Sequence, residues 1–229
     1  MILDFRYKKI IIDAALRIGT GMADYALKAA TTGFIHIETV AEYNQYCHYV
    51  SGIPVEIMSQ IFSASGKESL SIGANLELNN SLGLFIQKSD IIRDFREDVD
   101  QKRYFWPREF WGRKECGFRE ITEMCNTDPD SLRRATYVQS AMILDALQHV
   151  TDALDYLRLL RNQSVFHFLA IIIVKSFTDL ELCFMNKEIF QRKMKRRKAE
   201  AANVCECAFF FLLTGKLMCG CSSLCGALI

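Results

Sequence analysis

The chain has 229 residues, of which 50% are hydrophobic and 24% are charged, and its formal net charge is +1. This length and composition suit a globular domain with a sizeable core. The near-zero net charge excludes a chain-wide attraction to nucleic acid or to an anionic membrane. The N-terminal stretch does not resemble a signal peptide, because Asp4, Arg6, Lys8 and Lys9 interrupt its apolar residues.

Helical periodicity runs through most of the chain, and proline is rare. Clusters of turn-forming residues separate the apolar segments. In the cluster at 126–131, Asp130 or Ser131 is the expected N-cap of the next helix. We therefore predict an all-α chain with one domain over residues 1–203. The expected helices cover residues 4–30, 40–62, 75–99, 107–118, 130–161, 163–185 and 187–203.

Two apolar segments differ in character. Residues 164–174 are strongly apolar but too short for a transmembrane helix, which needs about 20 apolar residues, so we expect a buried core helix. Residues 204–229 form an apolar, Cys-rich tail, where cysteine spacing does not match a paired zinc site and no histidine lies nearby. Two interpretations of the tail stay open: a short membrane-associated end, or sequence foreign to the fold.

Three aspartates, Asp90, Asp94 and Asp98, follow one another at intervals of four residues. A step of four drifts only about 40° around a helix, so their carboxylates form a stripe. Like charges at this spacing destabilise a helix by about 0.2–0.5 kcal/mol per pair. A bound divalent cation would offset that cost.

The residues around the stripe allow two interpretations. Leu82 and Ile86 continue the same helix face backwards, which predicts an apolar cavity with an acidic mouth. Such a cavity suits a long hydrocarbon with a phosphate head, and carboxylate oxygens suit Mg²⁺. The alternative is a solvated acidic face paired with Arg93 and Arg96.

Three long blocks of sequence, at residues 40–69, 79–113 and 144–168, resemble the squalene synthase branch of the squalene/phytoene synthase family. The resemblance implies an all-α isoprenoid-synthase (prenyltransferase) bundle around a central cavity. It implies a farnesyl-diphosphate farnesyltransferase that joins two farnesyl diphosphates head to head, giving presqualene diphosphate. Enzymes of this family then reduce the intermediate to squalene with NADPH, in the presence of Mg²⁺.

The resemblance gives the aspartate stripe a role. Asp94 and Asp98 match the family's second aspartate-rich motif, which binds Mg²⁺ and diphosphate. Asp90 stands where the family usually has asparagine, so it keeps an oxygen ligand and adds a charge. Gln87 and Arg93 match neighbouring substrate contacts.

The resemblance also assigns aromatic residues. Tyr46 matches a catalytic tyrosine that assists the first condensation, although its helical spacing alone suits core packing. Phe166 and Phe168 match aromatics of the second step, where aromatic faces would shelter carbocations. Ordinary buried phenylalanines are the alternative. Gln163, just upstream, matches a polar residue of the same block.

Residues 192–198 carry six basic side chains in seven positions. Composition alone suggests a solvated helix face or a nuclear localisation signal. The resemblance implies instead that Lys195 and Arg197 bind the phosphates of NADPH.

The chain also departs from the family pattern. It has no second D-x-x-x-D pair outside residues 90–98, so we expect it to begin after the family's first helices and to form an incomplete bundle. Beyond about residue 198 we find no match, and the family's C-terminal membrane anchor is not seen. By analogy we expect the cytosolic face of the endoplasmic reticulum membrane, with a cytoplasmic location or peripheral membrane contact as alternatives.

Two further functions stay open beside the squalene synthase reaction. One is an inactive homologue that only binds prenyl diphosphate or a full-length partner. The other is phytoene-type synthesis, which would not depend on NADPH. The sequence indicates no nucleic-acid partner.

Overall fold

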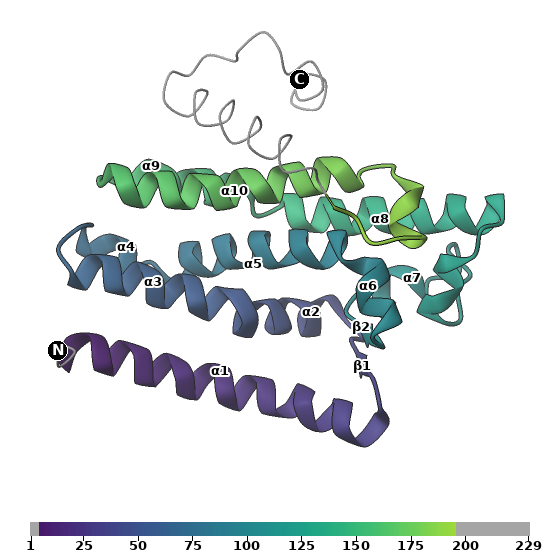
Figure 1. Ribbon diagram of the computed structural model, residues 1–229, viewed down its shortest axis with the longest axis horizontal. Helices are drawn as coiled ribbons and strands as arrows, with labels where there is room; N and C mark the ends of the chain where they lie inside the picture. Colours follow the sequence, from purple (N-terminus) through teal and green to yellow (C-terminus); the bar gives the residue numbers. More distant parts are fainter. Residues whose placement is uncertain (1–4, 196–229) are drawn as a thin grey trace, which may run out of the picture.

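The computed structural model describes residues 5–195, so the tail predicted at 204–229 lies outside the described part. The described part is built almost entirely from helices, which confirms the predicted all-α class (Figure 1). The α-helices are α1 (Phe5–Thr32), α2 (Val40–Cys47), α3 (Ile53–Ala64), α4 (Leu70–Ala74), α5 (Leu76–Arg93), α6 (Phe95–Asp100), α7 (Arg108–Trp111), α8 (Pro129–Leu147), α9 (Val150–Leu159) and α10 (Gln163–Cys183).

Shorter elements connect these helices. Strands β1 and β2 pair in parallel, with Ile35 opposite Arg103. This pairing ties the end of α1 to the segment that follows α6. The short elements are the strands β1 (Ile35–His36) and β2 (Arg103–Tyr104), the π-helix η1 (His48–Gly52) and the 3₁₀ helices η2 (Ile121–Cys125) and η3 (Lys187–Phe190).

The helix α5 occupies the middle of the bundle. It packs against η1 and α3 on one side and against α8, α9 and α10 on the other, while α1 lies along the outer edge beyond α3 (Figure 1). The helix that carries Asp90 and Arg93 is therefore fixed by neighbours on both sides.

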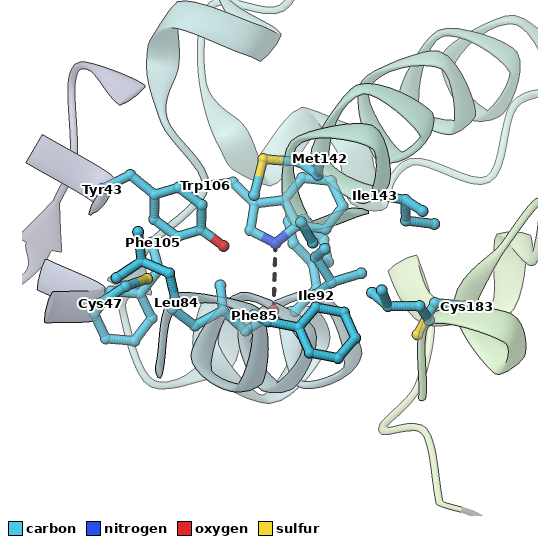
Figure 2. Close-up of a cluster of buried hydrophobic side chains, with 14 of the residues drawn as sticks. Tyr43, Cys47, Leu84, Phe85, Ile92, Phe105, Trp106, Met142, Ile143 and Cys183 are labelled. Atoms are coloured by element: carbon cyan, nitrogen blue, oxygen red, sulfur yellow. Dashed lines mark hydrogen bonds between the residues drawn. The ribbon is translucent and has the colours of Figure 1, made fainter. Parts of the chain in front are cut away.

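Large side chains fill the core around α5. Leu82, Phe85 and Ile92 of α5 are fully buried. The indole nitrogen of Trp106 donates a hydrogen bond of 3.3 Å to the carbonyl oxygen of Ile91 (Figure 2). Burying each such side chain contributes about 1.5–3 kcal/mol, so the position of α5 is set mainly by apolar packing.

Two glycines let η1 approach α5 closely. A Cβ atom on Gly83 would lie only 2.5 Å from the Cα atom of Gly52. A π-helical turn widens the backbone, and such turns are often found at functional sites. Here the turn directly follows Tyr46 and Cys47, so it fixes the segment that bears the candidate catalytic tyrosine.

Two predicted helices are broken. The helix predicted at 75–99 ends at Arg93 and restarts at Phe95, because Asp94 leaves helical geometry with φ −90° and ψ 11°. The helix predicted at 130–161 divides into α8 and α9 around Gln148 and His149. Both breaks occur where polar side chains make tertiary contacts.

Three other local predictions are wrong. The helix predicted at 107–118 reaches only from Arg108 to Trp111. In the helix predicted at 187–203, the described part is a 3₁₀ turn that ends at Phe190. The N-cap of α8 is Asp128 rather than Asp130 or Ser131, because Pro129 takes the first helical position and the Asp128 carboxylate accepts from the Ser131 N–H at 2.9 Å.

The prediction of a buried core helix at 164–174 is confirmed for the helix but only in part for its burial, because Phe168 and Ile171 are 50% and 49% exposed. Residues 164–174 lie within α10, which buries one side against the bundle. Within residues 5–195, no helix is long and apolar enough to cross a membrane.

Candidate active site

Arg93, the last residue of α5, holds two of the three aspartates. Its Nε and Nη2 atoms donate to the two oxygens of Asp94, at 2.9 and 2.7 Å. Its Nη1 atom donates to Asp90 Oδ1 at 2.8 Å. Two-point pairing of a guanidinium with a carboxylate is both strong and directional. Arg93 therefore fixes the orientation of Asp94 at the helix break.

Helix α10 completes this cluster with two further charges. Asp179 accepts from Arg93 Nη1 at 2.5 Å and from Lys175 Nζ at 2.9 Å. Lys175 Nζ also donates to Asp90 Oδ1 at 2.7 Å. We call Asp90, Arg93, Asp94, Lys175 and Asp179 the charge cluster. Its three carboxylates and two cations leave a formal charge of −1.

Burial differs across the charge cluster. The Asp179 side chain is 6% exposed, whereas those of Asp90 and Asp94 are 33% and 29% exposed. Burial alone would lower the pKa of Arg93, but the hydrogen bond to Asp94 and the charges of Asp90 and Asp179 raise it well above its usual range. The open side of the cluster therefore presents Asp90 and Asp94 to an incoming ligand.

Asp98 lies in a different environment from the other two aspartates. It is buried in α6, and its Oδ1 atom accepts from Arg103 Nε at 3.0 Å and Nη2 at 2.6 Å. Burial raises the pKa of Asp98 to about 6 and outweighs the opposing effect of Arg103. Asp94 and Arg93 also shift this pKa, so Asp98 borders the charge cluster electrostatically.

The predicted aspartate stripe is therefore divided. Backbone hydrogen bonds of 2.9 Å from Asp94 to Asp90 and from Asp98 to Asp94 keep the four-residue register through the break. The side chains nevertheless diverge, and within residues 5–195 no three Asp, Glu, His or Cys residues gather as a metal-binding group. The role of the three aspartates as metal ligands stays a prediction.

Tyr46 lies in α2, close to Asp98 and Arg103. Its ring stacks on Phe105, with centroids 4.6 Å apart, and meets Tyr25 of α1 edge to face at 5.0 Å. Burial, reinforced by the charge of Asp98, raises the pKa of Tyr46 to about 12. Its hydroxyl therefore keeps its proton at neutral pH.

Local sequence explains why α2 presents Tyr46 here. Thr39 caps the helix by accepting a hydrogen bond of 3.1 Å from the Glu42 N–H. Glu42 in turn pairs with Lys28 of α1 at 2.6 Å, which holds α2 against α1.

The predicted aromatic pair is not brought together. Phe166 and Phe168 are two residues apart on α10, which separates them by about 200° around the helix. Phe166 is half-buried and packs against the core, whereas Phe168 is 50% exposed. Gln163 is exposed at the start of α10, and Gln87 is half-buried on α5.

The basic run is described only in part. Arg192 pairs with Glu188, and Lys193 pairs with Glu97, so these two charges serve the fold. Lys195 is exposed, and Arg197 lies outside the described residues.

Sequence reasoning missed several residues of the site. Asp179 and Lys175 carried a signal, since their spacing of four on a helix permits an ion pair. Arg103, Tyr25 and Phe105 carried none, because only the β1–β2 pairing and the packing of α1 bring them beside Tyr46 and Asp98.

The fold and the charge cluster define an all-α protein with a carboxylate-rich, arginine-containing site. The model of the squalene/phytoene synthase family matches residues 4–197. The chain therefore belongs to the squalene/phytoene synthase family, which confirms the predicted resemblance.

Curated relatives carry the name squalene synthase. The chain is 50% identical to the Ganoderma lucidum protein over 210 residues, which cover 88% of this chain and 44% of that one. It is 38% identical to the Schizosaccharomyces pombe protein over 198 residues, covering 86% and 42% of the two chains. It is 37% identical to the human protein over 199 residues, covering 87% and 45%. The chain thus spans less than half the length of these relatives.

A solved structure agrees with the family assignment. The complex of TcSQS with a ligand matches with a TM-score of 0.79 at 34% sequence identity, covering 92% of this chain and 60% of that chain. The isoprenoid-synthase fold predicted from the resemblance is thereby confirmed.

Proposed function

We propose that this chain provides squalene synthase-type transferase chemistry. In that reaction two farnesyl diphosphates condense head to head to presqualene diphosphate, which is reduced to squalene for isoprenoid and sterol biosynthesis. Membership of the family and the names of the curated relatives support this proposal. We also propose the family's location at the endoplasmic reticulum membrane.

The charge cluster is the observation that carries the proposal. Asp90 and Asp94 are partly exposed beside the guanidinium of Arg93. Carboxylate oxygens are the ligands that Mg²⁺ accepts together with substrate phosphates, and a guanidinium matches the geometry of phosphate oxygens. The donor set therefore fits a Mg²⁺–diphosphate group at Asp90 and Asp94. Asp98, which is buried against Arg103, would act on this Mg²⁺–diphosphate group through its charge.

Cofactor chemistry follows from these residues. When bound, Mg²⁺ would supply positive charge that stabilises the departing diphosphate. When bound, NADPH would supply the hydride of the reductive step, with Lys195 and Arg197 as proposed partners of its phosphates. The exposed ammonium of Lys195 suits that pairing.

Tyr46 contributes a proton donor in this scheme. Because its pKa is about 12, the hydroxyl stays protonated and can donate to an oxygen of the leaving diphosphate in the first condensation. Phe166 and Phe168 would present aromatic faces to carbocations. Gln87 and Gln163 remain proposed substrate contacts.

Binding calorimetry tests the proposal directly. The chain is titrated with farnesyl diphosphate with and without Mg²⁺, and Asp94→Asn is compared with Asp100→Asn. Asp100 is a 55%-exposed acid that pairs with Arg96 outside the charge cluster. We expect Mg²⁺-dependent binding that weakens at least about tenfold in Asp94→Asn, through the loss of a charged ligand, and is unchanged in Asp100→Asn.

Product analysis then separates the remaining functions. Labelled farnesyl diphosphate should give squalene only with NADPH, and presqualene diphosphate without it. Binding without any product would favour a homologue that only binds prenyl diphosphate. A folded chain with no Mg²⁺-dependent binding would contradict the proposal.

A further inference from the structure

Four charged groups of the charge cluster form a closed ring between α5 and α10, which lie side by side (Figure 1). Asp90 Oδ1 accepts a hydrogen bond from Arg93 Nη1 at 2.8 Å and another from Lys175 Nζ at 2.7 Å. Asp179 Oδ2 accepts from the same two groups, at 2.5 Å and 2.9 Å. Positive and negative groups therefore alternate around the ring, and each cation is held by one carboxylate from each helix.

The two cations of the ring differ in how far solvent reaches them. The side chains of Asp179 and Arg93 are only 6% and 18% exposed, whereas that of Lys175 is 49% exposed. Asp179 and Arg93 therefore form the inner half of the ring. Lys175 lies on its open side, bonded to the partly exposed Asp90. A ligand that approaches Asp90 and Asp94 would meet the ammonium of Lys175 next to them.

Lys175 keeps a hydrogen-bond donor for such a ligand. An ammonium group has three N–H bonds and no acceptor. Asp90 and Asp179 each accept from one of them, so a third N–H remains. Because two carboxylates already hold the ammonium in place, binding a ligand would cost little further side-chain entropy. A compact positive charge of this kind is a common partner of phosphate oxygens.

The sum of charges decides when an anion could bind beside Lys175. The charge cluster has three carboxylates and two cations, so its formal charge of −1 disfavours an anion by itself. If Asp90 and Asp94 bind Mg²⁺ as proposed, the two added positive charges bring the sum to +1. A diphosphate would then meet both the metal ion and the Lys175 ammonium. The alternative is that Lys175 serves only as the counter-ion of Asp90.

The exposed surface of α10 favours the first of these roles. Ile171 and Phe168 precede Lys175 by four and seven residues, so both lie within about 40° of it around the helix. They are among the exposed large apolar residues of the described part. An apolar stripe about 10 Å long therefore leads along α10 to the ammonium. A prenyl diphosphate has the same order of groups, with an apolar chain followed by an anionic head.

We propose that Lys175 is a further diphosphate-binding residue of the candidate active site, an inference that rests on the proposed function. Its third N–H donates to a phosphate oxygen, while Asp90 and Asp179 hold the ammonium in place. The prenyl chain of the same ligand extends from this head group along Ile171 and Phe168. Lys175 thereby fixes the direction in which one substrate molecule lies on α10.

Binding calorimetry with inorganic diphosphate tests the role of Lys175 without requiring catalysis. The titrations are made at a MgCl₂ concentration that saturates every variant, so that differences in Mg²⁺ affinity do not contribute. We expect Lys175→Met to weaken diphosphate binding at least about tenfold, through the loss of a charge-assisted hydrogen bond. Lys175→Arg should keep most of the affinity, because a guanidinium has the same charge and N–H groups to donate. Urea denaturation checks that each variant is folded.

Two comparisons separate a diphosphate contact from a structural role. Lys28→Met, which removes a similarly exposed lysine paired with Glu42 at 2.6 Å, should leave diphosphate binding unchanged. Lys175→Met should not weaken Mg²⁺ binding measured without diphosphate, because Lys175 shares Asp90 with the proposed metal ion. Weaker Mg²⁺ binding in Lys175→Met would mean that the lysine only organises the carboxylates, and would overturn the inference.

The outcomes also distinguish this inference from the proposed function. Diphosphate binding that Lys175→Met leaves unchanged would overturn only the role of Lys175. A folded chain that binds no diphosphate in the presence of Mg²⁺ would contradict the proposed function as well. Binding that depends on Lys175, in a chain that forms no product, would support the inference and contradict only the transferase activity.

Discussion

Tyr46 shows how much of the proposed chemistry depends on one hydroxyl group. Its ring is held by Phe105 and Tyr25 through aromatic contacts that a phenylalanine would keep. We expect Tyr46→Phe to change the free energy of unfolding by less than about 1 kcal/mol. Product formation should fall about 10²–10⁴-fold, the usual contribution of a positioned proton donor.

Presqualene diphosphate formation and chemical denaturation are both measured for Tyr46→Phe and for the unmodified chain, under the same conditions. Tyr137→Phe is the matched control, because Tyr137 is 62% exposed on α8. Full activity in Tyr46→Phe would remove the hydroxyl from the proposed chemistry and leave the ring as a packing element.

At the scale of helices, the charge cluster joins α5 to α10, and under the proposed function its lysine would compete with Mg²⁺ for Asp90. Lys175 places an ammonium 2.7 Å from Asp90, which is one of the proposed Mg²⁺ ligands. Its side chain is 49% exposed, so solvent screens the interaction and about 1 kcal/mol is a reasonable limit. We expect Lys175→Met to tighten Mg²⁺ binding about three- to fivefold at low ionic strength.

Calorimetric titration with MgCl₂ measures this effect without any substrate. Lys28→Met is the control, because Lys28 is 52% exposed and forms a 2.6 Å pair with Glu42 away from the charge cluster. Weaker Mg²⁺ binding in Lys175→Met would mean that Lys175 organises the carboxylates rather than competing for them.

The close contact between α5 and η1 should make Gly83 intolerant of a larger side chain. Alanine at Gly83 would place its Cβ 2.5 Å from Gly52 Cα, and this backbone cannot move aside without repacking. We expect Gly83→Ala to lower the free energy of unfolding by about 1–3 kcal/mol. Gly19→Ala, which meets no neighbour, should raise it by about 0.5–1 kcal/mol through helix propensity.

Urea denaturation of both glycine variants measures the difference. A neutral Gly83→Ala would show that α5 and η1 can separate without cost, which the buried packing around them argues against.

The same elements show what sequence could and could not predict. Periodicity located α1, α5 and α10 because each follows a long, regular apolar pattern. It missed the break at Asp94, where Arg93 bonds Asp94 beside it and Asp179 on another helix. Contacts between residues 86 positions apart leave no trace in local spacing. The N-cap was missed differently, since the pair Asp128–Pro129 was a readable start signal.

At the scale of the whole molecule, two buried groups have opposite effects on how the free energy of unfolding changes with pH. His149 lies between Lys88, 3.1 Å from its Nε2 atom, and Ser81, 2.9 Å from its Nδ1 atom. Burial, followed by the charge of Lys88, lowers the pKa of His149 to about 4. Burial raises the pKa of Asp98 to about 6. Both groups therefore titrate between pH 4 and 6.5, with opposite signs.

The signs follow from proton counting. Between pH 4 and 6.5 the unfolded chain protonates His149 more than the native chain does, so this group makes stability rise with pH. Between pH 4 and 6 the native chain holds a proton on Asp98 that the unfolded chain has released, so this group makes stability fall with pH. At about 1.4 kcal/mol per pKa unit, the upper limit is about 3.5 kcal/mol for His149 and about 3 kcal/mol for Asp98.

Replacing either group should therefore reveal the pH dependence of stability that the other group contributes. We expect the free energy of unfolding of Asp98→Asn to rise more steeply with pH between 4 and 6 than that of the unmodified chain. His149→Gln should show the opposite change of slope. Urea denaturation at half-unit pH steps measures both slopes, and comparing slopes removes any constant loss of stability that a substitution causes. Equal slopes in the two variants would mean that neither group is perturbed by burial, and the electrostatic contact of Asp98 with Tyr46 and the charge cluster would then lose its physical basis.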